Sequence, residues 1–270
     1  MNKEYLISAA GGNITVIRTI DSPQPTEWYA SEGRYLVDKY EEKGAEQSGF
    51  FIPNSKHLEM SGGEFCGNAT RAAAILASDF GKEPEVEHTV SGYDGSVISK
   101  VKNIGNYRRG DYWYKVQSKF ADMTIKTTRG PVSYDGYDGE ADIVDLDGII
   151  HIVVDAMLPA SYEEVHNKLC KDHNLRNRPA VGVVWMEHIE DGIKIHPVVW
   201  VKGSNTFYYE TSCGSGTIAA SKVTSSSTIT QVTGQDISVN FSENEVILSS
   251  EMEVRLYDNL LRQSSKVSQV

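Results

Sequence analysis

Two short stretches of this 270-residue sequence repeat a pattern of residue types that could do acid–base chemistry. Residues 64–70 read EFCGNAT and residues 211–217 read TSCGSGT. Each stretch has a glycine directly after its cysteine, Cys66 or Cys213, and a threonine four residues after it. A run of small residues follows each stretch. This pattern predicts two tightly buried helices, each beginning at its cysteine.

The first turn of a helix offers unpaired backbone N–H groups and a partial positive charge, and both favour an anion. We therefore expect each helix end to lower the pKa of its thiol and to bind a substrate carboxylate. If the two ends face each other, a thiolate on one side of an amino acid removes the α-proton while a thiol on the other side returns one. Such a site would invert the α-carbon without a cofactor.

The two stretches resemble the motifs of the diaminopimelate-epimerase-like family of two-cysteine racemases, and within it they are most similar to the histidine racemases. The first motif matches over residues 60–70, and Gly12-Asn13 and residues 46–50 supply further ordered matches. The resemblance implies an α/β fold with two pseudo-symmetric domains. Each would be a β-sheet or barrel wrapped around a central helix, with the catalytic cleft between the two.

The resemblance also assigns roles to residues. It implies that Cys66 and Cys213 are catalytic. It implies no metal and no cofactor, and a small amino acid as the partner of the site. The residues expected to bind this substrate are Asn13, Gln47, Gly67, Asn68, Gly214, Ser215 and Glu210. The side-chain pocket cannot be derived from the sequence, and Tyr208, Tyr209 and Glu46 are candidates by position.

The two cysteines lie a little over half a chain length apart, as expected when each half contributes one copy of a unit. We predict an N-terminal domain of residues 1–117, to which a C-terminal strand near 252–260 returns. Residues 118–251 would form the C-terminal domain. The crossover is expected near residues 115–122.

Composition excludes several classes of function. A formal net charge of −11 argues against nucleic acid and against an anionic membrane surface as partners, because both require an excess of basic residues. The first residues form no apolar signal-like run and no stretch is long enough to span a membrane, so we expect a cytoplasmic protein. Three cysteines do not indicate a disulfide framework. A homodimer is left open.

Periodicity and turn residues predict the elements that must position the motifs. Two strands should flank the turn at Gly11-Gly12, which would bring Asn13 inward. Helices are expected at residues 26–43 and 161–174, the second with Ser161 as N-cap and Cys170 as a structural thiol. His188 and His196 flank a hairpin turn and are expected at the surface. The strands are expected at residues 45–52, 88–90, 96–101, 112–116, 123–127, 143–146, 149–154, 181–185 and 193–201, with more up to 257 and a polar tail at 262–270.

The sequence departs from the diaminopimelate epimerases where those enzymes hold the far end of their substrate. Ser204-Asn205-Thr206-Phe207 stands where they carry an arginine, and Gly148-Ile149-Ile150-His151 replaces a Gly-Asn-Pro-His turn. A third family asparagine would fall in the apolar residues 181–184. A distal zwitterion left unpaired there would cost roughly 3 to 5 kcal/mol. Diaminopimelate is therefore disfavoured.

Two alternatives stay open. The chain could be an epimerase or racemase of another amino acid, of the diaminopimelate or proline type, although proline racemase-like sequences are expected to show Cys-Gly-His where this chain has Cys66-Gly67-Asn68. It could also be a catalytically silent amino-acid-binding protein whose cysteines act as a redox latch. Exchange of an α-proton in heavy water would separate these classes.

Overall fold

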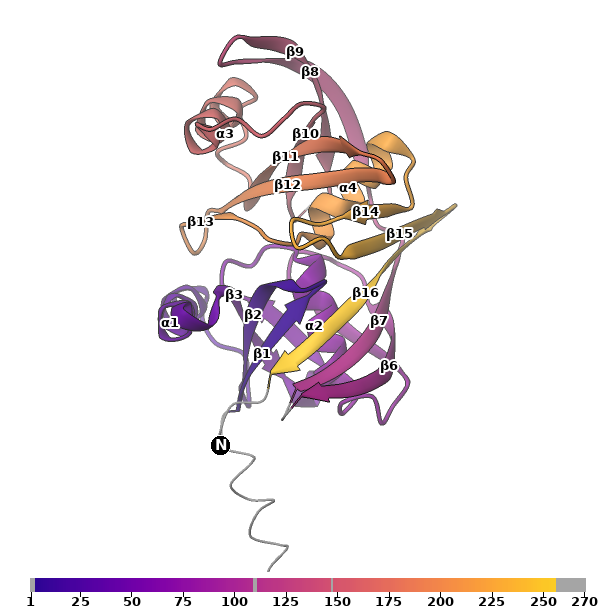
Figure 1. Ribbon diagram of the computed structural model, residues 1–270. Helices are drawn as coiled ribbons and strands as arrows, with labels where there is room; N and C mark the ends of the chain where they lie inside the picture. The colour runs from indigo at the N-terminus through magenta and orange to yellow at the C-terminus, as the bar shows by residue number, and fades with distance from the viewer. Residues whose placement is uncertain (1–2, 109–110, 147, 256–270) are drawn as a thin grey trace, which may run out of the picture.

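The computed structural model describes residues 3–108, 111–146 and 148–255. Over these residues the chain forms a sheet-rich α/β fold with sixteen strands and four α-helices (Figure 1). The sequence also predicts a turn at Arg109-Gly110-Asp111, of which the first two residues lie outside the described residues. The part of the expected returning strand beyond Arg255 and the polar tail lie outside them as well.

The first half of the fold comprises residues 4–121. Its elements are β1 (Glu4–Ala9), β2 (Gly12–Thr19), α1 (Thr26–Lys39), β3 (Ala45–Ile52), β4 (His57–Met60), α2 (Gly67–Ala77), β5 (Glu85–Val90), β6 (Val97–Arg108) and β7 (Asp111–Ala121). The second half begins at residue 126. It contains β8 (Lys126–Tyr134), β9 (Tyr137–Asp145), β10 (Ile150–Val154), α3 (Tyr162–Asp172), β11 (Ala180–Ile189), β12 (Gly192–Val201), β13 (Thr206–Tyr209), α4 (Gly214–Thr224), β14 (Thr228–Thr230), β15 (Asp236–Ser242) and β16 (Glu245–Arg255).

Helices α2 and α4 are the centres of the two halves, and strands surround each of them (Figure 1). Every residue of α2 from Gly67 to Ile75 is buried, and so is every residue of α4 from Gly214 to Ser221. A helix buried on all sides consists mainly of small and apolar residues, and Arg71, the bulky polar residue of α2, hydrogen-bonds to Gly67, Asn68 and Ser250. The alanine-rich and glycine-rich runs after each cysteine let strands approach the helix closely. The prediction of two tightly buried helices is confirmed.

Strand β16 connects the two halves of the sheet. It pairs antiparallel with β15 and with β7, and its last residues also pair with β1. Val254 is aligned with Ile7 on one side and with Tyr112 on the other. The end of the described chain therefore lies beside its beginning, inside the first half.

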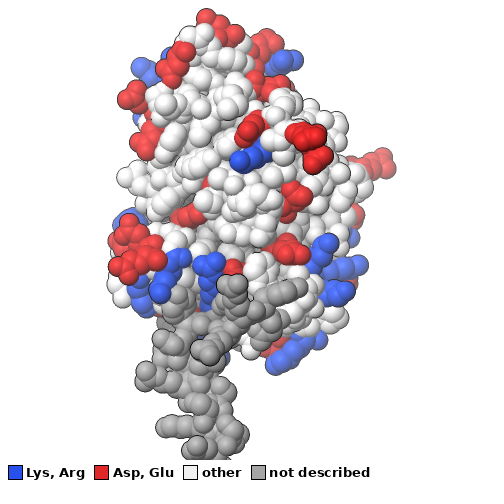
Figure 2. All heavy atoms as spheres, viewed as in Figure 1, with Lys and Arg blue, Asp and Glu red and all other residues white. Residues whose placement is uncertain are grey.

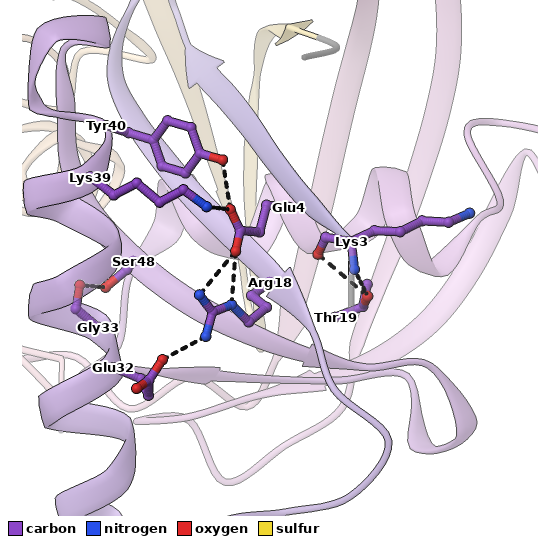
Figure 3. Close-up of polar contacts among 9 residues, drawn as sticks. All are labelled: Lys3, Glu4, Arg18, Thr19, Glu32, Gly33, Lys39, Tyr40 and Ser48. Carbon is purple, nitrogen blue, oxygen red and sulfur yellow. Dashed lines mark hydrogen bonds and ion pairs between the residues drawn. The ribbon is translucent and has the colours of Figure 1, made fainter. Parts of the chain in front are cut away.

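Helix α1 covers the outer face of the first half, and an ion-pair network holds it there (Figure 3). Glu4 on β1 accepts hydrogen bonds from Arg18 at 2.9 Å, Lys39 at 2.7 Å and Tyr40 at 2.6 Å, and Arg18 also binds Glu32 on α1. Burial alone would raise the pKa of Glu4, but these three donors hold it below its usual value. This carboxylate is thus fully paired, and the pairing fixes α1 against the sheet.

Four details differ from the sequence-based expectation. Residues 115–121, expected to form the crossover, belong to β7, because their backbone pairs with both β6 and β16. The strand expected from Met123 begins only at Lys126. Helix α1 ends at Lys39, and a short 3₁₀ turn at Glu41–Lys43 completes the predicted helical segment. Ser161 is the N-cap of α3, but its hydroxyl binds Asp135 and not the helix backbone.

Charged side chains of both signs lie interspersed on the face shown in Figure 2, with more of the basic ones in the first half. Among the helices of the described chain, none has the length and apolar character that crossing a membrane requires.

Candidate active site

The two cysteines occupy equivalent positions in the two halves. Cys66 is the N-cap of α2 and Cys213 is the N-cap of α4, with nearly the same extended backbone (φ −132° and ψ 110°, φ −141° and ψ 110°). Each sulfur accepts a hydrogen bond from the N–H three residues later, at 3.4 Å for Cys66 and 3.3 Å for Cys213. The predicted placement of both cysteines at helix N-termini is confirmed.

The repeated threonine has a structural role in this arrangement. The Thr70 hydroxyl donates to the Cys66 carbonyl at 2.8 Å, and the Thr217 hydroxyl donates to the Cys213 carbonyl at 2.6 Å. These bonds fix the first turn of each helix, so they also fix the direction of the sulfur. The threonine of each motif therefore positions the cysteine, and other residues line the cavity.

The two helix ends meet at their glycines. A Cβ added to Gly214 would lie only 3.0 Å from the Gly67 carbonyl carbon, and one added to Gly67 would lie 2.9 Å from a Leu248 methyl group. The Asn68 side chain bridges the two motifs, because its amide donates to the Ser212 carbonyl at 2.9 Å. A glycine after each cysteine is thus required by the close approach of the two helices.

One small cavity of about 20 Å³ is lined by both thiols. Its lining comes from both motifs, from β3 and β12, and from the turn before β10. The first turn of α4 borders it through Gly214 and Ser215, and α2 borders it through its N-cap Cys66. A helix leaves its first N–H groups without intrahelical partners. The lining residues are Gln47, Glu64, Phe65, Cys66, Ile149, Val199, Val201, Glu210, Cys213, Gly214 and Ser215.

Gln47 and Asn13 form the first-half side of the site. The Cys66 thiol donates to the Gln47 side-chain oxygen at 3.3 Å, and the Gln47 amide donates to the Asn13 side-chain oxygen and to Thr15. Asn13 has φ 43°, so the turn does bring its side chain inward, where it is 1% exposed. Its amide nitrogen Nδ2 makes no hydrogen bond of standard geometry in the described part of the chain, although the Asn13 side chain acts on the Glu210 carboxyl and lowers the pKa of that group. A buried donor in this state is available to a ligand.

Three glutamates surround the same space: Glu64 is buried, and Glu46 and Glu210 are half-buried. Burial raises the pKa of Glu64 to about 7 and that of Glu210 to about 8, and the Glu46 carboxyl adds to the second effect. Burial also raises the pKa of Glu46, although the Thr211 hydroxyl, which donates to it at 2.7 Å, opposes this. Thr211 in turn accepts from the Asn13 backbone N–H. The site is therefore rich in carboxyl groups that hold their protons more tightly than usual.

The expected lowering of the thiol pKa values is wrong for this structure. Burial raises the pKa of Cys66 to about 12 and raises that of Cys213 well above its usual value, and the Glu210 carboxyl adds to both effects. The helix N–H groups act in the opposite direction, but desolvation of a thiolate in a closed cavity is the larger effect. Both groups are therefore thiols when the cavity is empty.

His151 and Arg71, which the sequence-based list omitted, also reach the site. The His151 ring lies 2.9 Å from the hydroxyl of the predicted residue Ser215, which in turn lies 3.6 Å from the Cys213 sulfur, so a polar chain leads from the cysteine into the second half. Arg71 is fully buried and binds Gly67, Asn68 and Ser250, and burial lowers its pKa to about 10. Its place in the motif five residues after Cys66 was the available signal, because a residue there lies on the buried face of the predicted helix.

An adjoining cavity extends outward from the thiols and shares Gln47, Glu64, Val199, Val201 and Glu210 with the first one. Of the pocket candidates, Glu46 and Tyr208 line it. Tyr209 does not appear in its lining and binds His196 at 2.7 Å. From the segment that replaces the arginine of the diaminopimelate epimerases, Ser204 and Thr206 line the cavity, whereas Asn205 is exposed.

The remaining candidates lie apart from the site. Cys170 is buried on α3 next to His166, at 3.5 Å. His188 is exposed and binds Asp155, but His196, expected at the surface, is half-buried between Glu187 and Tyr209. Within the described ranges, no group of three or more His, Cys, Asp or Glu side chains could hold a metal ion.

Comparison with solved structures identifies the fold. A putative phenazine biosynthesis PhzC/PhzF protein from Clostridium difficile (strain 630) is similar with a TM-score of 0.51 at 13% identity, covering 95% of this chain and 98% of that one. A phenazine biosynthesis protein of the PhzF family from Enterococcus faecalis gives 0.50 at 14% identity, over 96% and 100%. At these identities the likeness concerns the fold alone. The chain has the mixed α/β fold of the PhzF-family structures.

Sequence comparison identifies the family. Histidine racemases from two strains of Fusobacterium nucleatum subsp. nucleatum are 31% and 30% identical over 182 residues, which is 65% of this chain. The matched region spans 63% and 64% of the length of those relatives. The family model described as "Histidine racemase CntK N-terminal domain" matches residues 5–242, a range that includes both cysteine motifs and every residue predicted to bind substrate. The chain therefore belongs to the family that this histidine racemase domain defines.

Proposed function

We propose that this protein is a cofactor-independent amino-acid racemase that acts on histidine by a two-base mechanism at Cα. The observation that carries the proposal is that two N-cap cysteines, one from each half, line a single buried cavity. The name of the relatives from Fusobacterium nucleatum supports histidine as the substrate.

The polar groups of the cavity accommodate the two charges of an amino acid. The α-carboxylate binds the free first-turn N–H groups of Gly67, Asn68, Gly214 and Ser215, where both helix dipoles favour an anion. The α-ammonium group donates to Glu210, which borders both cavities. The Asn13 amide supplies one further donor on the first-half side. Substrate binding thus places Cα between Cys66 and Cys213.

The proton balance of the reaction is closed. One thiolate takes the α-proton and becomes a thiol, while the opposite thiol gives its proton to the other face of Cα and becomes a thiolate. One thiol must first lose its proton, and both hold theirs in the empty cavity. The α-amino group of the substrate, entering as the free amine, takes this proton and becomes the ammonium group. Its positive charge beside the buried sulfurs then stabilises the thiolate. Deprotonation is therefore coupled to substrate binding.

The experiment that tests this function is α-proton exchange of L-histidine in heavy water, followed by NMR together with formation of D-histidine. We expect both reactions without added cofactor, and kcat/KM for diaminopimelate at least ~10³-fold lower, because Arg34, the basic residue among the described lining residues, is exposed and its charge is screened by solvent. Exchange confined to diaminopimelate or to an aliphatic amino acid would reject histidine as the substrate. Absence of any exchange would favour the silent binding protein.

We further propose that the fold is diaminopimelate-epimerase-like and that the two halves are pseudo-symmetric domains, residues 1–117 with the strand near 252–260, and residues 118–251. The matching environments of Cys66 and Cys213 support this division, although residues 117 and 118 lie within β7. Limited proteolysis would test it by cleaving the connection at residues 122–125 before either half. A cytoplasmic location and a homodimer stay predictions.

A further inference from the structure

Two carboxylate oxygens in the outer cavity have no hydrogen-bond partner within the described chain. They are Oε2 of Glu64 and Oε2 of Glu46, and both atoms are buried. Glu64 is only 5% exposed. A buried carboxyl oxygen without a donor is costly, so its persistence in a cavity indicates a ligand that supplies the donor.

The position of these oxygens relative to the thiols suggests which part of the substrate they meet. Glu64 lines both cavities, and Glu46 lines the outer one together with Tyr208. Val199 and Val201 line both cavities as well. A substrate with Cα between the two cysteines must therefore direct its side chain along these valines toward Glu46 and Glu64.

The residues that line the outer cavity favour some substrate side chains over others. Its walls combine valine methyl groups with carboxyl oxygens that need N–H donors, so it suits a flat ring with apolar faces and N–H groups at its edge. A cation is favoured further, because it would pair with carboxyl groups whose pKa values burial has raised. Arg34 is the basic residue among the described lining residues, and it is exposed, where solvent screens its charge.

Resting on the proposed racemase function, we propose that Glu46 and Glu64 form the subsite for the substrate side chain and that they select an imidazole ring by accepting its N–H groups. An aliphatic or carbocyclic side chain leaves both oxygens unpaired. A side chain that ends in a carboxylate offers neither oxygen an N–H donor. Substrate specificity thus comes from two carboxyl oxygens of Glu46 and Glu64, which stay without a hydrogen bond when the substrate side chain has no N–H donor.

Free imidazole tests the subsite without requiring turnover. Calorimetric titration should detect imidazole binding to the wild-type protein, and the double substitution Glu46→Gln with Glu64→Gln should weaken it at least ~10-fold. The matched control is Glu253→Gln, since Glu253 is a buried glutamate on β16 that binds Ser8 and Arg255 outside both cavities. Thermal unfolding of each variant verifies that it is folded. Equal imidazole affinity in wild type and folded double variant overturns the subsite.

Substrate discrimination supplies the second readout. β-(2-Thienyl)alanine has a five-membered aromatic ring of similar shape without N–H groups. The wild type should prefer histidine over it by ~10³-fold or more in kcat/KM, and the double variant should reduce this ratio below ~10-fold, mainly through the KM for histidine. Glu253→Gln should keep the wild-type ratio.

The outcomes separate the subsite from the proposed function. If the wild type racemises histidine and the folded double variant keeps the preference over thienylalanine, the subsite is wrong and the racemase function stands. If no amino acid exchanges its α-proton, the racemase function is wrong, and the imidazole titration alone still decides the subsite.

Discussion

The sites of Cys66 and Cys213 share one backbone design and differ in what faces the sulfur. Cys66 is partly exposed and donates to the neutral amide of Gln47. Cys213 is 2% exposed and lies against Ser215 and the Glu210 carboxyl. Two copies of the same helix end therefore hold thiols in unequal electrostatic surroundings. Two bases of a racemase can thus differ in their properties although the motifs that hold them have the same backbone structure.

The largest expected effect comes from removing either sulfur. Cys66→Ala and Cys213→Ala should each reduce histidine racemisation by more than ~10³-fold, since inversion needs a proton acceptor and a donor on opposite faces. Residual α-proton exchange should be confined to one enantiomer in Cys66→Ala and to the other in Cys213→Ala, which NMR in heavy water can measure. Cys170→Ala is the matched control on α3. Near-normal turnover in either motif variant would break the two-base model.

A smaller effect is expected at the glycines where the helix ends meet. In Gly214→Ala the new Cβ meets backbone of the Gly67 residue at 3.0 Å, whereas in Gly67→Ala it first meets a movable Leu248 methyl group. Gly214→Ala should therefore lower kcat/KM about 10- to 100-fold and the free energy of unfolding by about 1 to 3 kcal/mol. Gly67→Ala should do less of both. Steady-state kinetics and urea unfolding compare the two variants. A larger loss in Gly67→Ala than in Gly214→Ala would contradict the contact between Gly214 and the Gly67 backbone.

The unequal exposure of the thiols should appear in their chemical reactivity. Because burial raises both pKa values, alkylation by iodoacetamide should be slow near pH 7 and should accelerate toward pH 12, with Cys66 labelled before Cys213. Mass spectrometry of the two motif peptides gives the order. Rapid labelling of both cysteines at pH 7 would mean that the helix ends lower the pKa of each thiol by more than desolvation raises it.

The raised pKa values also make a prediction about stability. The folded state holds the Glu64 proton up to about pH 7, whereas the unfolded chain releases it near 4.5. The stability from this group is present below pH 4.5 and is lost as pH rises through 7. By pH 8 the loss is on the order of 3 kcal/mol. Glu64→Gln should therefore raise the free energy of unfolding at pH 8 and leave it little changed at pH 4.5, as measured by urea titration.

The smallest expected effect is that of metal removal. No metal is proposed at either thiol, so dialysis against a chelator should change racemisation by less than about twofold. Activity that is lost on dialysis and regained only with zinc would contradict this.

The sequence was sufficient to predict the helix ends and the positions of many strands along the chain, because these depend on local signals. A cysteine followed by glycine and a run of small residues predicts a buried helix start, and the structure has one at both Cys66 and Cys213. The pKa of each thiol could not be predicted, because it depends on burial by strands distant in sequence. The same holds for Glu64, which sits within the first motif but borders the cavity only once Val199 and Val201 close over it.

Strand β16 has a consequence for how the chain folds. The register of residues 252–255 against β1 joins positions almost 250 residues apart in sequence, and the same strand borders β7. Loop-closure entropy makes such distant pairings slow to form. During synthesis the first half can assemble around α2, but its β1 edge stays open to solvent until residues 245–255 have left the ribosome. An open strand edge is a template for aggregation, so shortening β16 should reduce the yield of soluble protein before it alters either thiol.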